Sequence, residues 1–231
     1  IAQPTGSGEY VRRRVVARIV NRHCPTGGRV VDMGGGVGNL YVALRRDLRH
    51  RYTVVDVERA GYGVRIVGDV TAAPLAGGSA DFVCLSDVLE HLVHDTDAVQ
   101  EAVRAGRPGA HVVLHVPSTR TKPYAFLQRA ADGAEAVDHQ QFPHVRDGYT
   151  EDTLRSMLGE VAGASIVTLE PSFAPSQSLL SDLDAYLWWH KWTPLRVVPW
   201  LGIRLASRRA VRPVPAESSS GYVALLRKSL A

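Results

Sequence analysis

The stretch Gly28-Arg-Val-Val-Asp-Met-Gly-Gly-Gly-Val-Gly38 decides the fold of this chain. It opens with a β-branched run, Val30-Val31, which the acidic residue Asp32 follows. Glycines then stand at positions 34, 35, 36 and 38, and the apolar residues of 40–44 begin an amphipathic helix. This order predicts a strand, a glycine turn and a helix, the opening of a nucleotide-binding α/β unit. Glycine suits the turn because it has no Cβ to prevent a tight backbone or a close ligand.

The glycine spacing differs from the dinucleotide fingerprint G-x-G-x-x-G. The sixth position is Asn39 when counted from Gly34 and Tyr41 when counted from Gly36, and neither residue is small. The spacing that is present, from Asp32 through Gly34 and Gly36 to Gly38, resembles motif I of the class I S-adenosylmethionine (SAM) methyltransferases. A carboxylate at the strand end suits the ammonium group of SAM. An ordinary glycine turn is the alternative, and an NAD-binding oxidoreductase is disfavoured by the missing third glycine.

Length and composition fit one soluble α/β domain spanning residues 1–231. The formal net charge is +4, but nearly all basic residues are arginine, with lysine at positions 122, 191 and 228. No basic run with interleaved aromatic residues indicates nucleic acid, so we expect no nucleic-acid partner. Cys24 and Cys84 form neither a disulfide framework nor a metal pair. Without a visible signal peptide or a long apolar span, the expected location is cytoplasmic.

A second acidic residue ends the next predicted strand. The run Tyr52-Thr-Val-Val-Asp56 reads as strand 2, and Asp56 at its end can accept hydrogen bonds from ribose hydroxyls, with Val57 beside it. The alternative is a surface aspartate at a strand end. Strand 3, residues 64–67, follows after so few residues that we expect a turn in place of a crossover helix.

The resemblance to SAM methyltransferases continues through residues 68–92. It implies that Asp69 receives the adenine amino group, that Val70 packs on the ring, and that Ser86 contacts the cofactor. The run from Pro74 to Leu92 is similar to the small-molecule methyltransferase pattern that ends in Leu-Glu-His after strand 4. Its Leu-Pro and Phe-Asp pairs are inverted here.

The order of the remaining elements extends the match. We expect a helix over residues 95–106, a strand over 111–117 and a long substrate-binding connection over 118–149. A second helix should begin at residue 150, and residues 164–170 and 221–227 should form an antiparallel strand pair. The predicted fold is therefore a Rossmann-like, seven-stranded and mostly parallel sheet with an antiparallel last strand and helices on both faces.

An aromatic insertion, residues 171–220, separates the last two strands. Three of the four tryptophans lie within 188–192, and Pro194 and Pro199 forbid one continuous helix. The insertion could form a satellite core over the sheet, cap an apolar substrate, make a homodimer contact, or lie at a membrane surface through residues 186–203.

Candidate chemistry follows strand 4 in the run Asp87-x-x-Glu90-His91. On the first turn of a helix these side chains would converge. With the later His144, the run resembles the metal-dependent methyltransferases of small-RNA 3′ ends and ubiquinone precursors, which implies that Asp87, Glu90, His91 and His144 bind Mg²⁺, Mn²⁺ or Zn²⁺. The alternative is that Glu90 and His91 stabilise the cofactor loop.

A histidine is also the expected general base, and His91 and His144 are the candidates. His139 lies in the same long connection, whereas His115 falls inside strand 5 and is expected in the core. These observations predict a SAM-dependent methyltransferase acting on an oxygen or nitrogen of a small molecule, with a secondary metabolite as one candidate. The alternative is a methyltransferase-fold protein that binds SAM without methyl transfer, as pericyclases or regulatory modules do.

Overall fold

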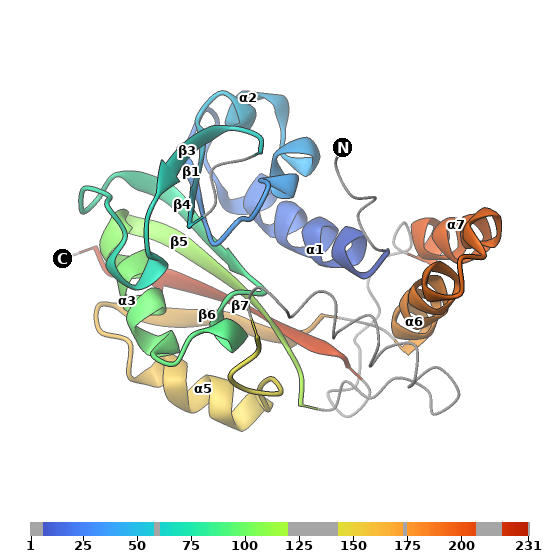
Figure 1. Cartoon of the computed structure of the whole chain (residues 1–231). Coiled ribbons are helices and arrows are strands. Elements are labelled where there is room, and N and C mark those ends of the chain that lie inside the picture. Colours follow the sequence, from blue (N-terminus) through green and yellow to red (C-terminus); the bar gives the residue numbers. More distant parts are fainter. Residues whose placement is uncertain (1–6, 58–60, 120–142, 173–174, 207–218, 231) are drawn as a thin grey trace.

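A seven-stranded sheet forms the centre of the molecule in the computed structural model (Figure 1). The structure describes all residues except 1–6, 58–60, 120–142, 173–174, 207–218 and 231. The strand order is β3-β2-β1-β4-β5-β7-β6. The strands are β1 (Val30–Met33), β2 (Tyr52–Asp56), β3 (Val64–Val67), β4 (Ala80–Ser86), β5 (Gly106–Pro117), β6 (Ala164–Pro171) and β7 (Gly221–Lys228).

Strand β7 is antiparallel to both of its neighbours, whereas β1 to β5 pair in parallel. The residues of β7 alternate between the two faces of the sheet, so that Leu226 joins one hydrophobic core and Leu225 the other. Because both faces are covered, strands such as β4 read as nearly continuous apolar runs. The predicted fold class is confirmed.

Helices cover the sheet on both sides (Figure 1). Helix α1 (Ser7–His23) packs Val16 and Val20 into one core, and helices α3 (Asp95–Ala105) and α5 (Glu151–Gly159) pack Val99 and Leu154 into the other. Thr150 caps α5, because its hydroxyl accepts the amide proton of Thr153 at 3.1 Å.

The prediction of an amphipathic α-helix directly after the glycine turn is wrong. A 3-10 helix, η1 (Asn39–Ala43), follows Gly38, then Leu44 and Arg45 are extended, and the four-residue α2 (Arg46–Arg49) comes after them. The cause is tertiary: Asn21 of α1 accepts the Arg45 amide proton at 2.7 Å and donates to the carbonyl of Ala43 at 3.1 Å. These bonds hold the chain in a form that a regular helix could not adopt.

Other boundaries differ less. Strand β5 begins at Gly106, which pairs with Ala80, and not at the predicted residue 111. Residues 107–109 lie within the strand as an irregularity, with Gly109 at φ +77°. Two further 3-10 helices, η2 (Val70–Ala72) and η3 (Leu89–His91), follow β3 and β4. Most of the expected substrate-binding connection 118–149, including His139, lies outside the described residues.

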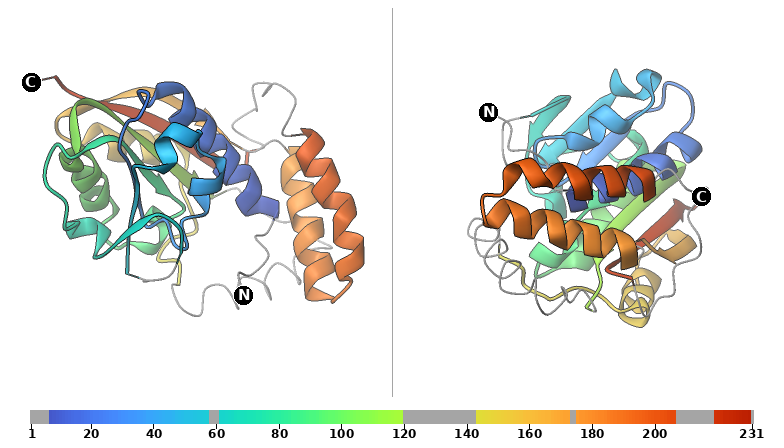
Figure 2. Two further views of the ribbon diagram at one scale, coloured as in Figure 1. Left: turned by 90° about the horizontal axis from the view of Figure 1, so that it is seen from above. Right: turned by 90° about the vertical axis from the view of Figure 1, so that its right-hand side faces the viewer.

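The aromatic insertion forms a helical hairpin made of α6 (Pro175–Trp189), η4 (Thr193–Arg196) and α7 (Val197–Ala206). Figure 2 shows the two α-helices side by side at one end of the molecule, next to α1 and away from the sheet. Ile203 of α7 is buried against Val11 of α1. Pro199 is tolerated because it stands in the first turn of α7.

Candidate active site

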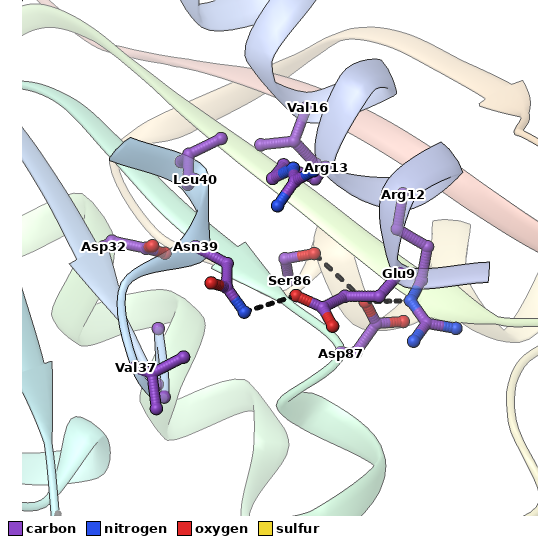
Figure 3. Close-up of a pocket in the computed structure, with 13 residues that line it drawn as sticks. Glu9, Arg12, Arg13, Val16, Asp32, Val37, Asn39, Leu40, Ser86 and Asp87 are labelled. Carbon is purple, nitrogen blue, oxygen red and sulfur yellow. Dashed lines mark hydrogen bonds and ion pairs between the residues drawn. The ribbon is translucent and has the colours of Figure 1, made fainter. Parts of the chain in front are cut away.

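A cavity of about 370 Å³ opens at the carboxyl ends of β1 and β4, between the glycine turn and α1 (Figure 3). Ligands of open α/β sheets bind at this edge. Helix α1 contributes Glu9, Arg12, Arg13 and Val16 to the lining of the cavity. The other lining residues are Asp32 of β1, Gly34, Gly35, Gly36 and Val37 of the turn, Asn39 and Leu40 of η1, Ser86 at the end of β4, and Asp87.

The glycines of the turn are required by geometry. Gly34 has φ +73°, and a Cβ there would lie 2.4 Å from a methyl of Val88. A Cβ on Gly35 would lie 2.5 Å from a carboxylate oxygen of Asp32. A Cβ on Gly36, at φ +51°, would meet nothing within 4 Å. The turn therefore packs tightly on its protein side, and its backbone is exposed to a ligand at Gly36.

Asp32 lies at the base of the cavity and is almost fully buried. The hydroxyl of Tyr52 donates a hydrogen bond to Oδ2 of Asp32. Burial raises the pKa of Asp32 to about 6, although the Tyr52 hydrogen bond opposes the shift. A cation bound in the cavity would favour the ionised form, so this carboxylate suits an ammonium group.

Asp56, the predicted ribose acceptor, lies at the end of β2 and contacts the glycine turn directly. Its Oδ2 accepts the amide proton of Gly36 at 2.7 Å. Arg65 of β3 donates to the carbonyl of Gly36 at 2.7 Å. The turn is thus held by side chains from two neighbouring strands.

Like Asp56, the predicted cofactor-binding residues Val57, Asp69 and Val70 do not line the cavity. Val57 is 56% exposed, and Val70 is buried in the core beneath η2. Asp69 caps η2, because its Oδ1 accepts from the amide and the hydroxyl of Thr71, each at 2.8 Å. Asp69 and Val57 are exposed, so the side of the site that they would serve is open to solvent.

Helix α1 closes the other side of the cavity through two polar contacts that the sequence did not predict (Figure 3). Asn39 donates to Glu9 at 2.5 Å, and Arg12 forms an ion pair with Asp87 at 3.0 Å. The charges of Glu9 and Arg12 are visible in the sequence, but their partners lie in other elements, so the sequence alone could not pair them.

Asp87 belongs to a buried polar chain. Its Oδ1 lies 3.1 Å from Nδ1 of His115, and Nε2 of His115 lies 2.9 Å from the hydroxyl of Ser172. Burial raises the pKa of Asp87, but the charge of Arg12 and the contact with His115 outweigh it and hold the pKa at about 2. His115 is a buried core residue, as its place in strand 5 indicated.

A second cluster lies beyond β4 and combines Glu90, His91 and His144. One potential ligand atom from each lies within 4.8 Å of the others, and the two imidazole centroids are 4.5 Å apart. The amide of Val145 donates to the carbonyl of Glu90 at 2.9 Å and holds His144 beside η3. The structure therefore brings together three of the four predicted metal ligands.

Asp87 is the fourth and lies outside this cluster. It precedes η3, which is a 3-10 helix and not the first turn of an α-helix, and its backbone has a φ of +54°. Its side chain contacts Arg12 and His115 and not the residues of the cluster. Glu90 is buried, and its Oε2 has no hydrogen-bond partner among the described residues. Burial and the nearby Asp87 charge raise the pKa of Glu90 to about 8.

Comparison with known proteins gives a family match over most of the chain. A family model described as a methyltransferase domain matches residues 8–177. No curated protein sequence matches significantly.

Solved structures with similar folds include three proteins of low sequence identity. The 4+2 cyclase SpnF has a TM-score of 0.61 at 14% identity, covering 94% of this chain and 81% of its own. A Haemonchus contortus phosphoethanolamine N-methyltransferase 2 has 0.58 at 14%, covering 97% and 57%. The YcgJ protein of Bacillus subtilis has 0.56 at 12%, covering 96% and 99%. At these identities the likeness concerns the fold.

Proposed function

The chain belongs to the methyltransferase-domain family, and on this premise we propose that it transfers a methyl group from SAM to an oxygen or nitrogen of a small-molecule acceptor. The observation that carries the proposal is the buried carboxylate of Asp32 beneath a glycine turn that lines an open cavity. A secondary metabolite is one acceptor that we consider.

Two features of the cavity support SAM as its ligand, the buried carboxylate and the open backbone of the glycine turn. Asp32 would receive the ammonium of the methionine part. Gly36 presents backbone where an added Cβ would find no contact, so a ligand has room to lie against the turn. Ser86 and Asp87 line the same cavity, and Asp56 would hold the ribose from the end of β2. Val57, Asp69 and Val70 would then serve the adenine on the open side.

SAM, when bound, supplies a methyl group on a positively charged sulfur, and an acceptor lone pair displaces that sulfur in line. This chain needs no nucleophile of its own. Its task is to hold the acceptor collinear with the methyl and to accept a proton from a hydroxyl or ammonium acceptor. His91 comes four residues after the cavity residue Asp87, and the ring of His144 lies 4.5 Å from that of His91. We propose these two histidines as the groups that receive this proton.

Calorimetric titration with S-adenosylhomocysteine tests the cofactor assignment. We expect micromolar binding at one site per chain, and loss of binding in Asp32→Ala. Binding of NAD in preference would contradict the proposal. Asp56→Ala should weaken binding, and unchanged affinity would remove Asp56 from the ribose site.

Turnover separates a methyltransferase from a protein that binds SAM without transferring methyl. The test is necessary because the cyclase SpnF has a similar fold, so the fold alone does not distinguish the two classes. Incubation with SAM and a metabolite pool should form S-adenosylhomocysteine. Tight binding without turnover on any acceptor would favour the pericyclase-like or regulatory alternative.

As an alternative to this proton-accepting role, we propose that Glu90, His91 and His144 bind a divalent cation, Mg²⁺, Mn²⁺ or Zn²⁺. A carboxylate with two imidazoles suits these ions, and the buried Oε2 of Glu90 is an oxygen for which a cation would be a partner. A bound cation would orient acceptor hydroxyls at this place.

The metal proposal has a readout besides activity. Titration with MnCl₂ or ZnCl₂ should raise the melting temperature of the protein, and Glu90→Gln should abolish that rise. The matched control is Glu160→Gln, which follows α5 and lies on the exposed surface. Equal stabilisation of all three proteins by the metals would contradict the cluster as a site and leave its two histidines as general-base candidates.

A further inference from the structure

The outer face of the helical hairpin α6–α7 is apolar and exposed. Its exposed large side chains each have between 42% and 63% of their surface accessible, and they are Trp188, Trp192, Leu195, Val197, Val198, Leu201 and Leu205. We call these residues the hairpin face. Soluble monomers seldom expose so many large apolar side chains in one segment.

The spacing on α7 shows that the residues contributed by this helix share a side. Val198, Leu201 and Leu205 recur at intervals of three and four residues, whereas Pro199 and Ile203 are buried toward the body of the protein. Arg196 does not add free charge to the face, because it forms a two-fold contact with the buried Asp184 at 2.7 and 3.0 Å. The hairpin is thus fastened internally while its outer side remains apolar.

Exposed cations border the hairpin face. Lys191 stands between the two tryptophans, and Arg204 lies on the last turn of α7. No acidic residue occurs in the described segment 185–206. In the sequence, the next acidic residue after Asp184 is Glu217.

Helix α1 packs against the opposite side of α7, where Ile203 is buried against Val11. Trp200 of α7 packs on Tyr10 with ring centroids 5.2 Å apart, and Arg14 lies over the same tyrosine ring at 5.6 Å. Arg18 follows Arg14 by one turn on the same exposed side of α1. The positive border of the hairpin face therefore consists of Lys191 and Arg204, whereas α1 lies behind the hairpin, which Figure 2 shows at one end of the molecule.

We propose that the hairpin face docks on an anionic lipid surface. Tryptophan is favoured at the membrane–water interface, apolar helix faces insert at the acyl boundary, and neighbouring lysine and arginine attract anionic headgroups. In the described part of the chain, no helix combines the length and the apolar character needed to cross a bilayer. We therefore propose that the hairpin lies on the membrane surface and does not span the bilayer. A second copy of the chain fits less well, because the cations bordering each face would meet those of the other.

Vesicle flotation of the whole protein tests the proposal. We expect binding to vesicles that mix phosphatidylcholine with phosphatidylglycerol, and much weaker binding to phosphatidylcholine alone. Replacing two exposed residues, as Val198→Ser with Leu201→Ser, should lower partitioning by about tenfold or more. The control, Val167→Ser with Leu230→Ser, removes the same two residue types from exposed places outside the hairpin and should bind normally.

Charge is tested separately. Lys191→Gln with Arg204→Gln should weaken binding to the anionic vesicles by about fivefold for each cation and leave binding to neutral vesicles unchanged. Thermal melts show whether each variant is folded. Absence of binding by the parent protein, or equal binding by the Val198/Leu201 variant and its control, would overturn the proposal. Sedimentation showing a dimer that the same variant separates, with no vesicle binding, would overturn it in favour of self-association.

Discussion

Oδ1 of Asp87 lies 3.1 Å from Nδ1 of His115, and at this contact the backbone of Asp87 has a φ of +54°. Asp87 lines the cavity, whereas His115 is inside the sheet on β5. The buried histidine therefore sets the position of a side chain in the proposed cofactor site. Ser172, at the start of the aromatic insertion, fixes the other nitrogen of the same ring.

Removal of the Ser172 hydroxyl should destabilise the protein. In Ser172→Ala the buried Nε2 of His115 loses the partner at 2.9 Å, which should lower the free energy of unfolding by about 1–3 kcal/mol. Denaturant titration measures the change. Ser176→Ala, at an exposed position of α6, is the control and should have no effect. Equal stability of both variants would show that the serine contact contributes nothing.

The left-handed backbone of Asp87 predicts an order among substitutions. Asparagine tolerates a positive φ better than alanine does, so Asp87→Asn should retain about 1 kcal/mol more stability than Asp87→Ala. Both variants lose the ion pair with Arg12. The backbone contribution is isolated by comparing Asp87→Ala with Asp87→Gly, because neither has the polar side chain and only glycine adopts this φ without strain. An alanine variant as stable as the asparagine variant would contradict this account.

The raised pKa of Asp32, about 6, makes stability and ligand binding depend on pH in opposite directions. Burial favours the neutral acid, so the folded protein binds this proton more tightly than the unfolded chain. The free energy of unfolding should therefore fall as the pH rises from about 4 to about 6, by at most about 3 kcal/mol. Asp32→Asn should remove this slope in denaturant titrations at several pH values.

An ammonium ligand requires the ionised form of Asp32. The affinity for S-adenosylhomocysteine should therefore decrease by up to about tenfold for each pH unit below about 6. In Tyr52→Phe the carboxylate loses its hydroxyl donor, so the midpoint should move to higher pH. A pH-independent affinity in the parent protein would separate Asp32 from the ammonium.

Two glycine variants distinguish close packing from backbone strain. Gly35→Ala places a methyl group 2.5 Å from Asp32 and should cost about 1–3 kcal/mol of stability and reduce S-adenosylhomocysteine binding. Gly27→Ala occupies open space at φ +66°, so it should cost about 1 kcal/mol through strain and leave binding unchanged. Calorimetry on both variants checks the contrast.

The Arg196–Asp184 pair should stabilise the hairpin. Arg196→Ala leaves a buried carboxylate without its guanidinium partner, which should cost about 3–5 kcal/mol locally. Hydrogen exchange over residues 175–206 should accelerate while the sheet stays protected. Arg155→Ala breaks an exposed pair with Glu151 on α5 and should cost no more than about 0.5 kcal/mol.

The parts that the sequence predicted are those in which local signals decide the outcome. Strands β2 and β3 occupy the predicted residues, since each is a short β-branched run. Thr150 caps α5 through bonds to Thr153, which is three residues away. Asp32 and the glycines stand together because one continuous motif contains them. Their assignment to SAM stays a prediction.

The parts that sequence reasoning missed depend on contacts between distant residues. The helix expected from residue 40 onward is interrupted because Asn21, more than twenty positions earlier, binds the backbone around Arg45. The contact of His115 with Ser172 spans 57 positions and has no motif. Asp87 does not join the other predicted metal ligands because its carboxylate pairs with Arg12 of α1 and contacts His115.

The place of β7 has a consequence for the order in which the molecule can be made. β7 comes last in this chain, yet it lies between β5 and β6 and hydrogen-bonds to both. During synthesis on a ribosome, the six strands β1 to β6 are therefore made while the place between β5 and β6 is still empty. Completion must wait until residues 221–228 leave the exit tunnel, so the sheet closes only after its six other strands have been made. Until then, β5 and β6 each present an unpaired edge, and the nascent chain is most open to misassembly or to chaperones at that stage.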